Sequence, residues 1–137
     1  MSATRACRVP LYSHTGCHRE KLARALAKEM TRQNRFLPCY IQVNTGEEPQ
    51  KSGILPDQLE SFTQFCRDQL ALPIIGLMCI PPVDEEAAMH FALLNRMAQR
   101  LNVPKLSMGM SGDFEEAVGF GATSVRVGSA IFGARDA

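Results

Sequence analysis

Residues 73–82, PIIGLMCIPP, form a nearly continuous apolar run that ends in two prolines. The run lacks the strict alternation of apolar and polar residues that marks a half-buried strand. A strand that is apolar on both faces belongs in a sheet covered on both sides, and such sheets are typically parallel. We therefore expect a buried parallel strand over residues 73–80.

Helical patterns flank this strand on both sides. The preceding helix begins near Pro56, because proline is tolerated in the first turn of a helix. The following helix opens with residues 84–86, Asp-Glu-Glu, which place negative charge at the positive end of the helix dipole. The apolar stripes that the two helices bury are Leu59, Phe62, Cys66 and Leu70 in the first, and Phe91, Leu94, Ala98 and Leu101 in the second.

The alternation of strand and helix continues toward both ends of the chain. Before this region we expect an amphipathic helix from Arg19 to about Asn34, a strand over residues 39–44 and a polar loop over residues 45–53. After it we expect a strand over residues 105–110, a short helix from residue 112 or 113 to Phe120, a last strand over residues 123–127 and a helix beginning at Ser129. Gly121 suits the position just after a helix end.

The predicted order is a β-loop-α unit repeated about four times, with crossovers long enough for parallel pairing. A doubly wound sheet and a (β/α) barrel both fit this alternation. A complete (β/α)8 barrel usually needs about 250 residues, and this chain has 137. Four units make half a barrel, so three arrangements stay open: an open sheet, pairing with a second copy, or a fragment of a longer barrel.

The charge of the chain is unevenly distributed. Its 15 basic and 14 acidic residues give a net charge of +1. Residues 1–35 carry eight Lys/Arg and two Asp/Glu, a balance of +6, whereas the rest carries seven and twelve, a balance of −5. The solvated face of one amphipathic helix explains the basic part better than a nucleic-acid or membrane contact does. There is no Trp and no aromatic interleaving of the basic residues, so we expect no nucleic-acid partner.

Composition also indicates the compartment. No stretch approaches the roughly 20 apolar residues of a membrane span, and the N-terminus has no apolar signal region. Five scattered cysteines form no C-x-x-C pair, and the histidines have no metal-ligand spacing. We therefore expect neither a metal site nor a membrane contact, a surface or boundary place for His90, and a cytoplasmic protein.

Two segments rich in glycine and small polar residues could bind a phosphate group. They are residues 106–118, LSMGMSGDFEEAV, and residues 124–133, SVRVGSAIFG. Barrel enzymes often bind phosphate with the loops after their last two strands, and small residues let backbone N–H groups approach the oxygens. Ser111-Gly112 and Gly128-Ser129 would supply the donors. Tight turns that need glycine and serine explain the same residues equally well.

Three other residues have two open interpretations each. Arg126 lies in an otherwise apolar strand, so its guanidinium is either paired in the interior or aimed at a ligand. Asn44, at the end of a strand, caps a turn or faces a ligand, with the turn favoured. Met78 is more typical of core filling than of a cofactor wall.

The chain resembles the pyridoxal phosphate homeostasis proteins, which are single-domain relatives of the alanine racemase N-terminal barrel. The motifs that carry the resemblance are QVN (42–44), GEEPQKSG (46–53), GLMCIPP (76–82), LSMGMS (106–111) and VRVGSAIFG (125–133). They match in order from about Arg19 to the C-terminus. Residues 1–18 match poorly, so the domain is expected to be residues 19–137, the C-terminal half of a (β/α)8 barrel with parallel strands.

The resemblance implies a cytosolic barrel that binds pyridoxal 5′-phosphate (PLP) and buffers or delivers it without turnover of its own. It implies that Ser111, Gly128 and Ser129 contact the phosphate group and that Arg126 faces the pyridine end. Asn44 and Met78 would be wall positions nearby.

The family holds PLP on a lysine of its first strand, and no lysine of this chain stands in that motif. The lysines present are Lys21, Lys28, Lys51 and Lys105. We therefore expect impaired, non-covalent PLP binding. The alternatives are a remnant that acts only by association with another chain and, least favoured, an amino-acid racemase. Half a barrel would also leave unpaired strand edges and an apolar inner face, which predicts a homo-oligomer or a complementary half-barrel partner.

Overall fold

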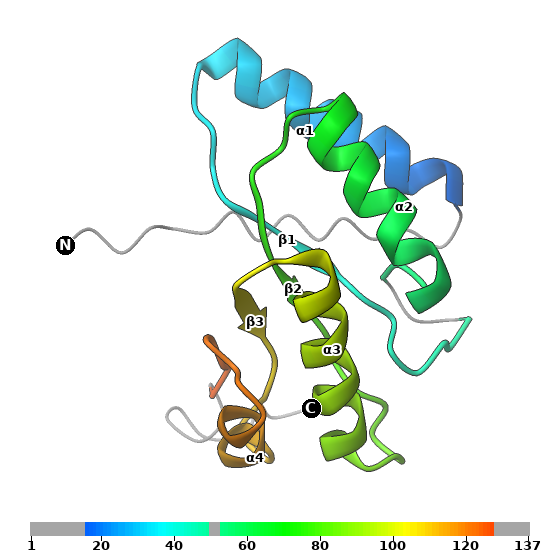
Figure 1. The fold of residues 1–137 in the computed structure, drawn as a ribbon, viewed down its shortest axis with the longest axis vertical. Helices are drawn as coiled ribbons and strands as arrows, with labels where there is room; N and C mark the ends of the chain where they lie inside the picture. Colours follow the sequence, from blue (N-terminus) through cyan, green and yellow to red (C-terminus); the bar gives the residue numbers. More distant parts are fainter. Residues whose placement is uncertain (1–15, 50–52, 128–137) are drawn as a thin grey trace, which may run out of the picture.

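The computed structural model describes residues 16–49 and 53–127, and within the first range it describes side chains from Glu20 onward. Its helices are α1 (Gly16–Gln33), α2 (Leu59–Gln64), α3 (Ala87–Leu101) and α4 (Phe114–Gly119), and its strands are β1 (Cys39–Gln42), β2 (Ile74–Met78) and β3 (Lys105–Ser107). A 3-10 turn, η1 (Pro56–Gln58), leads into α2, and a π-helical turn, η2 (Phe65–Gln69), continues it. Strands and helices alternate along the chain, so the fold is α/β (Figure 1).

The strands form one parallel sheet in the order β1-β2-β3. The apolar run found in the sequence is therefore the central strand, as its two apolar faces predict. Along the ladders Ile41 pairs with Leu77 and Leu77 with Leu106, and in the next row Gln42, Met78 and Ser107 are partners. Because paired residues point to the same side of a sheet, these two rows lie on opposite faces.

The row of Ile41, Leu77 and Leu106 faces the main core. Ile41 and Leu77 are fully buried, and they join a core cluster with Phe91 and Leu94 of α3. The predicted stripes of α2 and α3 supply further members: Leu59, Phe62, Cys66 and Ala98 are buried, and Leu70 and Leu101 pack against them. Each fully buried Leu, Ile or Phe stabilises the fold by about 1.5–3 kcal/mol. The burial of these residues confirms the predicted apolar stripes of both helices.

The other side of the sheet, here called the inner face, has mixed polarity. Its rows are Tyr40, Gly76 and Lys105, and then Gln42, Met78 and Ser107. The ring of Tyr40 lies so close over Gly76 that a Cβ added there would be 2.6 Å from its Cε1 atom. The expectation of an apolar inner face is wrong, because β1 places polar side chains at alternate positions.

The predicted strand over residues 123–127 does not form. Ser124 makes a single parallel bridge to Ser107, in which its N–H donates to the Leu106 carbonyl and its own carbonyl accepts from Met108. A continued ladder would take the Arg126 N–H to the Met108 carbonyl. It donates instead to the Gly109 carbonyl, at 2.8 Å, because Gly109 turns the chain with φ +103°.

Several boundaries also differ from the sequence expectation. Helix α1 begins at Gly16 rather than Arg19, and β3 ends at Ser107. The acids of residues 84–86 precede α3 instead of forming its first turn. The helix predicted from Ser129 lies outside the described residues. Within the described ranges, no helix is both long and apolar enough to span a bilayer.

Candidate functional site

The carboxyl ends of β1, β2 and β3 meet at one edge of the sheet, because the strands are parallel. Four of the residues predicted to bind a cofactor lie at this edge: Asn44, Met78, Ser111 and Arg126. The structure brings Arg126 and Met78 together, with the guanidinium Nη2 donating to the Met78 sulfur at 3.4 Å. Gly128 and Ser129, the other two predicted residues, lie outside the described residues.

Asn44 closes a turn after β1. Its Nδ2 donates to the Glu48 carbonyl at 2.8 Å, and its Oδ1 accepts from the Glu48 N–H at 3.2 Å. This turn packs tightly against the segment after β2, since a Cβ added at Gly46 would lie 2.4 Å from Pro82 Cγ. The turn role favoured from the sequence is therefore present. In these contacts the Asn44 amide bonds to its own loop.

The segment after β3 is held by three neighbouring interactions. The Arg126 N–H donates to the Gly109 carbonyl, and the Met110 N–H donates to Asp113 Oδ1 at 2.7 Å. A Cβ added at Gly109 would lie 2.7 Å from the Cβ of Ala117 on α4, so this backbone runs directly against the helix. Ser111, half-buried, follows in the same turn. The predicted phosphate-binding segment is thus a compact turn whose position depends on Gly109.

The electrostatics of this edge are mixed. Among the described residues of this edge, the positive charge comes from Arg126, which is half-buried. Acidic side chains occur in all three loops that follow the strands: Glu47, Glu48, Asp84, Glu85, Glu86 and Asp113. Solvent and salt screen the exposed ones. An anion at this edge would be attracted by one guanidinium and opposed by its acidic surroundings.

Two of the described cysteines, Cys66 and Cys79, have a raised pKa that makes them poor nucleophiles. Cys39, Cys66 and Cys79 are free and buried. Burial raises the pKa of the Cys66 thiol to about 12 and that of Cys79 to about 12. Near Cys79 the Asp113 carboxylate raises the pKa further, while the Thr45 hydroxyl lowers it. The Cys66 and Cys79 thiols therefore stay protonated at neutral pH, and a thiol reacts as its thiolate.

Sequence reasoning missed the way Asp113 and Thr45 approach Cys79 from the two neighbouring loops. The position of Asp113 could have been inferred from the sequence. Aspartate side chains in glycine- and serine-rich turns accept hydrogen bonds from nearby backbone N–H groups, and Asp113 lies three residues after Met110 in such a segment.

His90 is buried, at 3% exposure, so the expected surface or boundary place is wrong. Its Nε2 lies 3.3 Å from Glu85 Oε1. It is carried inside because it shares the α3 face of Phe91 and Leu94, which packs on the sheet. Across residues 16–49 and 53–127, no group of three His, Cys, Asp or Glu side chains could hold a metal ion.

In the part of the chain that the structure describes, the segments that follow the strands at the carboxyl edge carry no lysine. Lys21 and Lys28 are on α1, Lys105 begins β3 at the opposite end of the sheet, and Lys51 is outside the described residues. A covalent bond to a carbonyl cofactor needs an amine held against its carbonyl carbon. The described segments at this edge therefore supply the Arg126 guanidinium and the Ser111 hydroxyl, but no amine for covalent attachment.

The chain matches the family model of the alanine racemase N-terminal domain over residues 7–136. It belongs to this family. Proteins described as pyridoxal phosphate homeostasis proteins are similar to it. One from Pseudomonas aeruginosa is 42% identical over an alignment of 123 positions that covers 86% of this chain and 54% of that protein. One from Aquifex aeolicus is 35% identical over an alignment of 126 positions that covers 85% of this chain and 55% of that protein. The resemblance found in the sequence is confirmed.

Solved structures of the family also superpose on this chain. PipY of Synechococcus elongatus without PLP has a TM-score of 0.71 at 30% identity, covering 78% of this chain and 54% of PipY. PipY with PLP bound has a TM-score of 0.65 at 29% identity, covering 82% and 55%. The chain therefore spans about half the length of the relatives that it matches.

Proposed function

We propose that this chain binds the phosphate group of PLP reversibly at the carboxyl edge of its sheet and takes part in PLP homeostasis in the cytoplasm without catalysing a reaction. Arg126, held against Met78 by the contact at 3.4 Å, is the observation that carries the proposal. Ser111, Gly128 and Ser129 would donate hydrogen bonds to the phosphate group, and Arg126 would face the pyridine end. Asn44 and Met78 would be wall positions nearby. Residues 19–137 would correspond to the C-terminal half of the family's barrel.

The expected affinity is low. A hydrogen bond to a charged group contributes about 1.5–3 kcal/mol, and the acidic loops oppose part of this gain. Bound PLP supplies an electron sink for reactions of amino acids. Such reactions need the cofactor fixed by a lysine at this edge, which the described residues do not provide. For the same reason a racemase is the least favoured function.

Replacing Arg126 by methionine should weaken PLP binding at least tenfold, which corresponds to about 1.4 kcal/mol. Inorganic phosphate binding should change less, because Arg126 is expected at the pyridine end of the cofactor. Calorimetric titration of both ligands into the wild type and the variant measures this, with thermal unfolding as a check of the fold. Arg96→Met is the matched control, because Arg96 is exposed on α3. Equal heats from all three proteins would contradict the proposal. So would borohydride reduction that fixes one PLP on one lysine.

Association with another chain is the second candidate function, and β1 at the sheet edge favours it. On the outer side of β1 the Ile54 N–H donates to the Gln42 carbonyl at 2.8 Å, and the Asn44 N–H donates to the Ile54 carbonyl at 2.9 Å. Among the described residues nothing pairs with the backbone of Tyr40 on that side, and exposed strand edges recruit further strands.

We expect the purified chain to self-associate, or to bind a complementary half-barrel, at high ionic strength, where contacts between exposed charges are screened. Sedimentation velocity over a wide concentration range measures this. A compact monomer throughout that range would contradict an association through the strand edge.

A further inference from the structure

Helix α1 carries a basic stripe, defined as Arg24, Lys28 and Arg32. The proposed binding of PLP at the carboxyl edge of the sheet does not involve this stripe. The three residues follow one another at a spacing of four and so lie on one face of the helix. All three are exposed. Arg24 is held 4.9 Å from the centre of the Phe65 ring, and Arg32 bonds Glu29 on its own helix at 3.0 Å.

The stripe lines a groove between α1 and the end of η2, with a volume of about 540 Å³. Ala27 and Leu70 contribute apolar surface, and Thr31 and Gln69 contribute polar surface. None of the described residues that line the groove is acidic. The groove therefore combines three cations with a small apolar patch, and its ligand should combine acids with a small apolar side chain.

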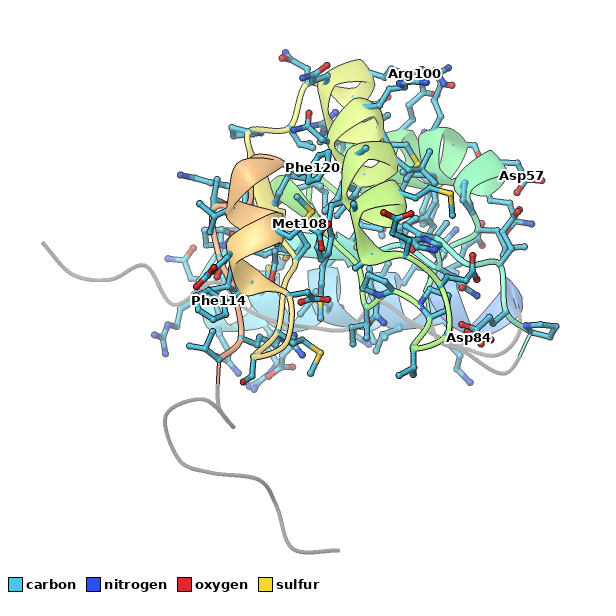
Figure 2. All side chains as sticks on the ribbon, turned by 90° about the horizontal axis from the view of Figure 1, so that it is seen from below. Asp57, Asp84, Arg100, Met108, Phe114 and Phe120 are labelled. Carbon is cyan, nitrogen blue, oxygen red and sulfur yellow. The ribbon has the colours of Figure 1, made fainter. Side chains whose placement is uncertain are left out.

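The loop between β2 and α3 has this combination. Val83 is 97% exposed, which marks it as the tip of the loop, and the acidic residues Asp84 and Glu86 beside it are exposed as well. Asp84 lies at the end of α3 away from Arg100 (Figure 2). Glu85 is partly engaged by His90, whereas Asp84 and Glu86 form no ion pair within the described residues.

The loop and the groove lie at opposite ends of β2. Leu70 precedes the start of the strand and Val83 follows its end, so one molecule cannot bring its loop into its own groove. A second copy can. The charge of the chain supports such a contact, since residues 1–35 balance to +6 and the rest to −5.

We propose that the Val83–Glu86 loop of one copy docks into the α1 groove of a second copy. Val83 covers Ala27 and Leu70, and Asp84 and Glu86 face the basic stripe. The contact is head-to-tail, so it leaves a free loop and a free groove at the two ends and builds rings or open chains. It differs from pairing at the β1 edge, because it depends on charge and weakens with salt.

Charge reversal tests the contact by sedimentation velocity at low ionic strength. The wild type should form species larger than a dimer as its concentration rises, and Lys28→Glu and Asp84→Lys should each raise the concentration needed at least tenfold. Mixing the two variants should restore pairing as far as a heterodimer, because each variant retains one intact surface and the free ends carry the altered ones. Arg100→Glu is the control: it makes the same change of charge at an exposed residue away from both surfaces and should behave as the wild type.

Several results would overturn the proposal. One is a wild type that stays monomeric at low ionic strength. Another is assembly beyond a dimer at low ionic strength that both single variants retain, or that Arg100→Glu loses to the same extent. A third is failure of the mixed variants to associate although each is folded by circular dichroism. Binding of polyuridylate or phosphatidylserine vesicles that Lys28→Glu abolishes, in a chain that does not self-associate, would assign the stripe to those ligands instead.

Discussion

Replacing Gly76 by alanine should remove a large share of the stability of the protein. An added Cβ would lie 2.5 Å from the Lys105 carbonyl oxygen and 2.6 Å from Tyr40 Cε1. The Tyr40 ring can rotate, but the Lys105 carbonyl belongs to the backbone of β3 and cannot move without separating β3 from β2. Overpacking of this kind costs about 3 kcal/mol, a large share of the 5–15 kcal/mol by which ordinary domains are stable.

Urea unfolding followed by circular dichroism measures this loss. Gly112→Ala is the matched control, because nothing lies within 4 Å of the added Cβ and Gly112 is not among the described glycines with positive φ. Its unfolding free energy should stay within about 1 kcal/mol of the wild type. A Gly76→Ala protein with an unchanged urea midpoint would show that the β2–β3 contact is looser than the structure has it.

Replacing Gly109 by alanine should destabilise the chain and also abolish phosphate binding. Gly109 has φ +103°, which side chains rarely adopt, and the added Cβ would lie 2.7 Å from the Cβ of Ala117. A strained backbone of this kind costs about 1–3 kcal/mol. Relief of the clash must move α4 or the turn that accepts the Arg126 N–H, and either movement displaces Ser111 and Arg126.

Two measurements separate these effects. Urea unfolding should give a loss of about 2–4 kcal/mol from strain and overpacking together, and titration of PLP and inorganic phosphate should give no heat under conditions where the variant is still folded. Gly119→Ala, at the end of α4 and with nothing within 4 Å of the added Cβ, should retain both stability and binding. Wild-type heats from a folded Gly109→Ala protein would place the phosphate site elsewhere.

The order of elements was predictable from the sequence, because it depends on local patterns. The run Ile74–Met78 is apolar on both faces and became the central strand, and the stripes of α2 and α3 at helical spacing became the buried faces of those helices. The candidate edge was predictable for a similar reason, since the carboxyl ends of successive parallel strands lie together. The segments that contain Asn44, Met78 and Ser111 could therefore be assigned to one edge.

What the sequence could not determine depends on contacts between distant residues. The segment over 123–127 has a strand composition, yet Gly109 shifts the hydrogen bond of Arg126 and ends the pairing after one bridge. Histidine is a polar residue type, and the sequence around His90 predicted a surface or boundary place. Packing of α3 on the sheet buries it instead. The contact of Arg126 with Met78 joins residues 48 positions apart. The spacing of apolar residues predicts which face of a helix or strand is apolar. Only the assembled fold determines which side chains and backbone groups that face contacts.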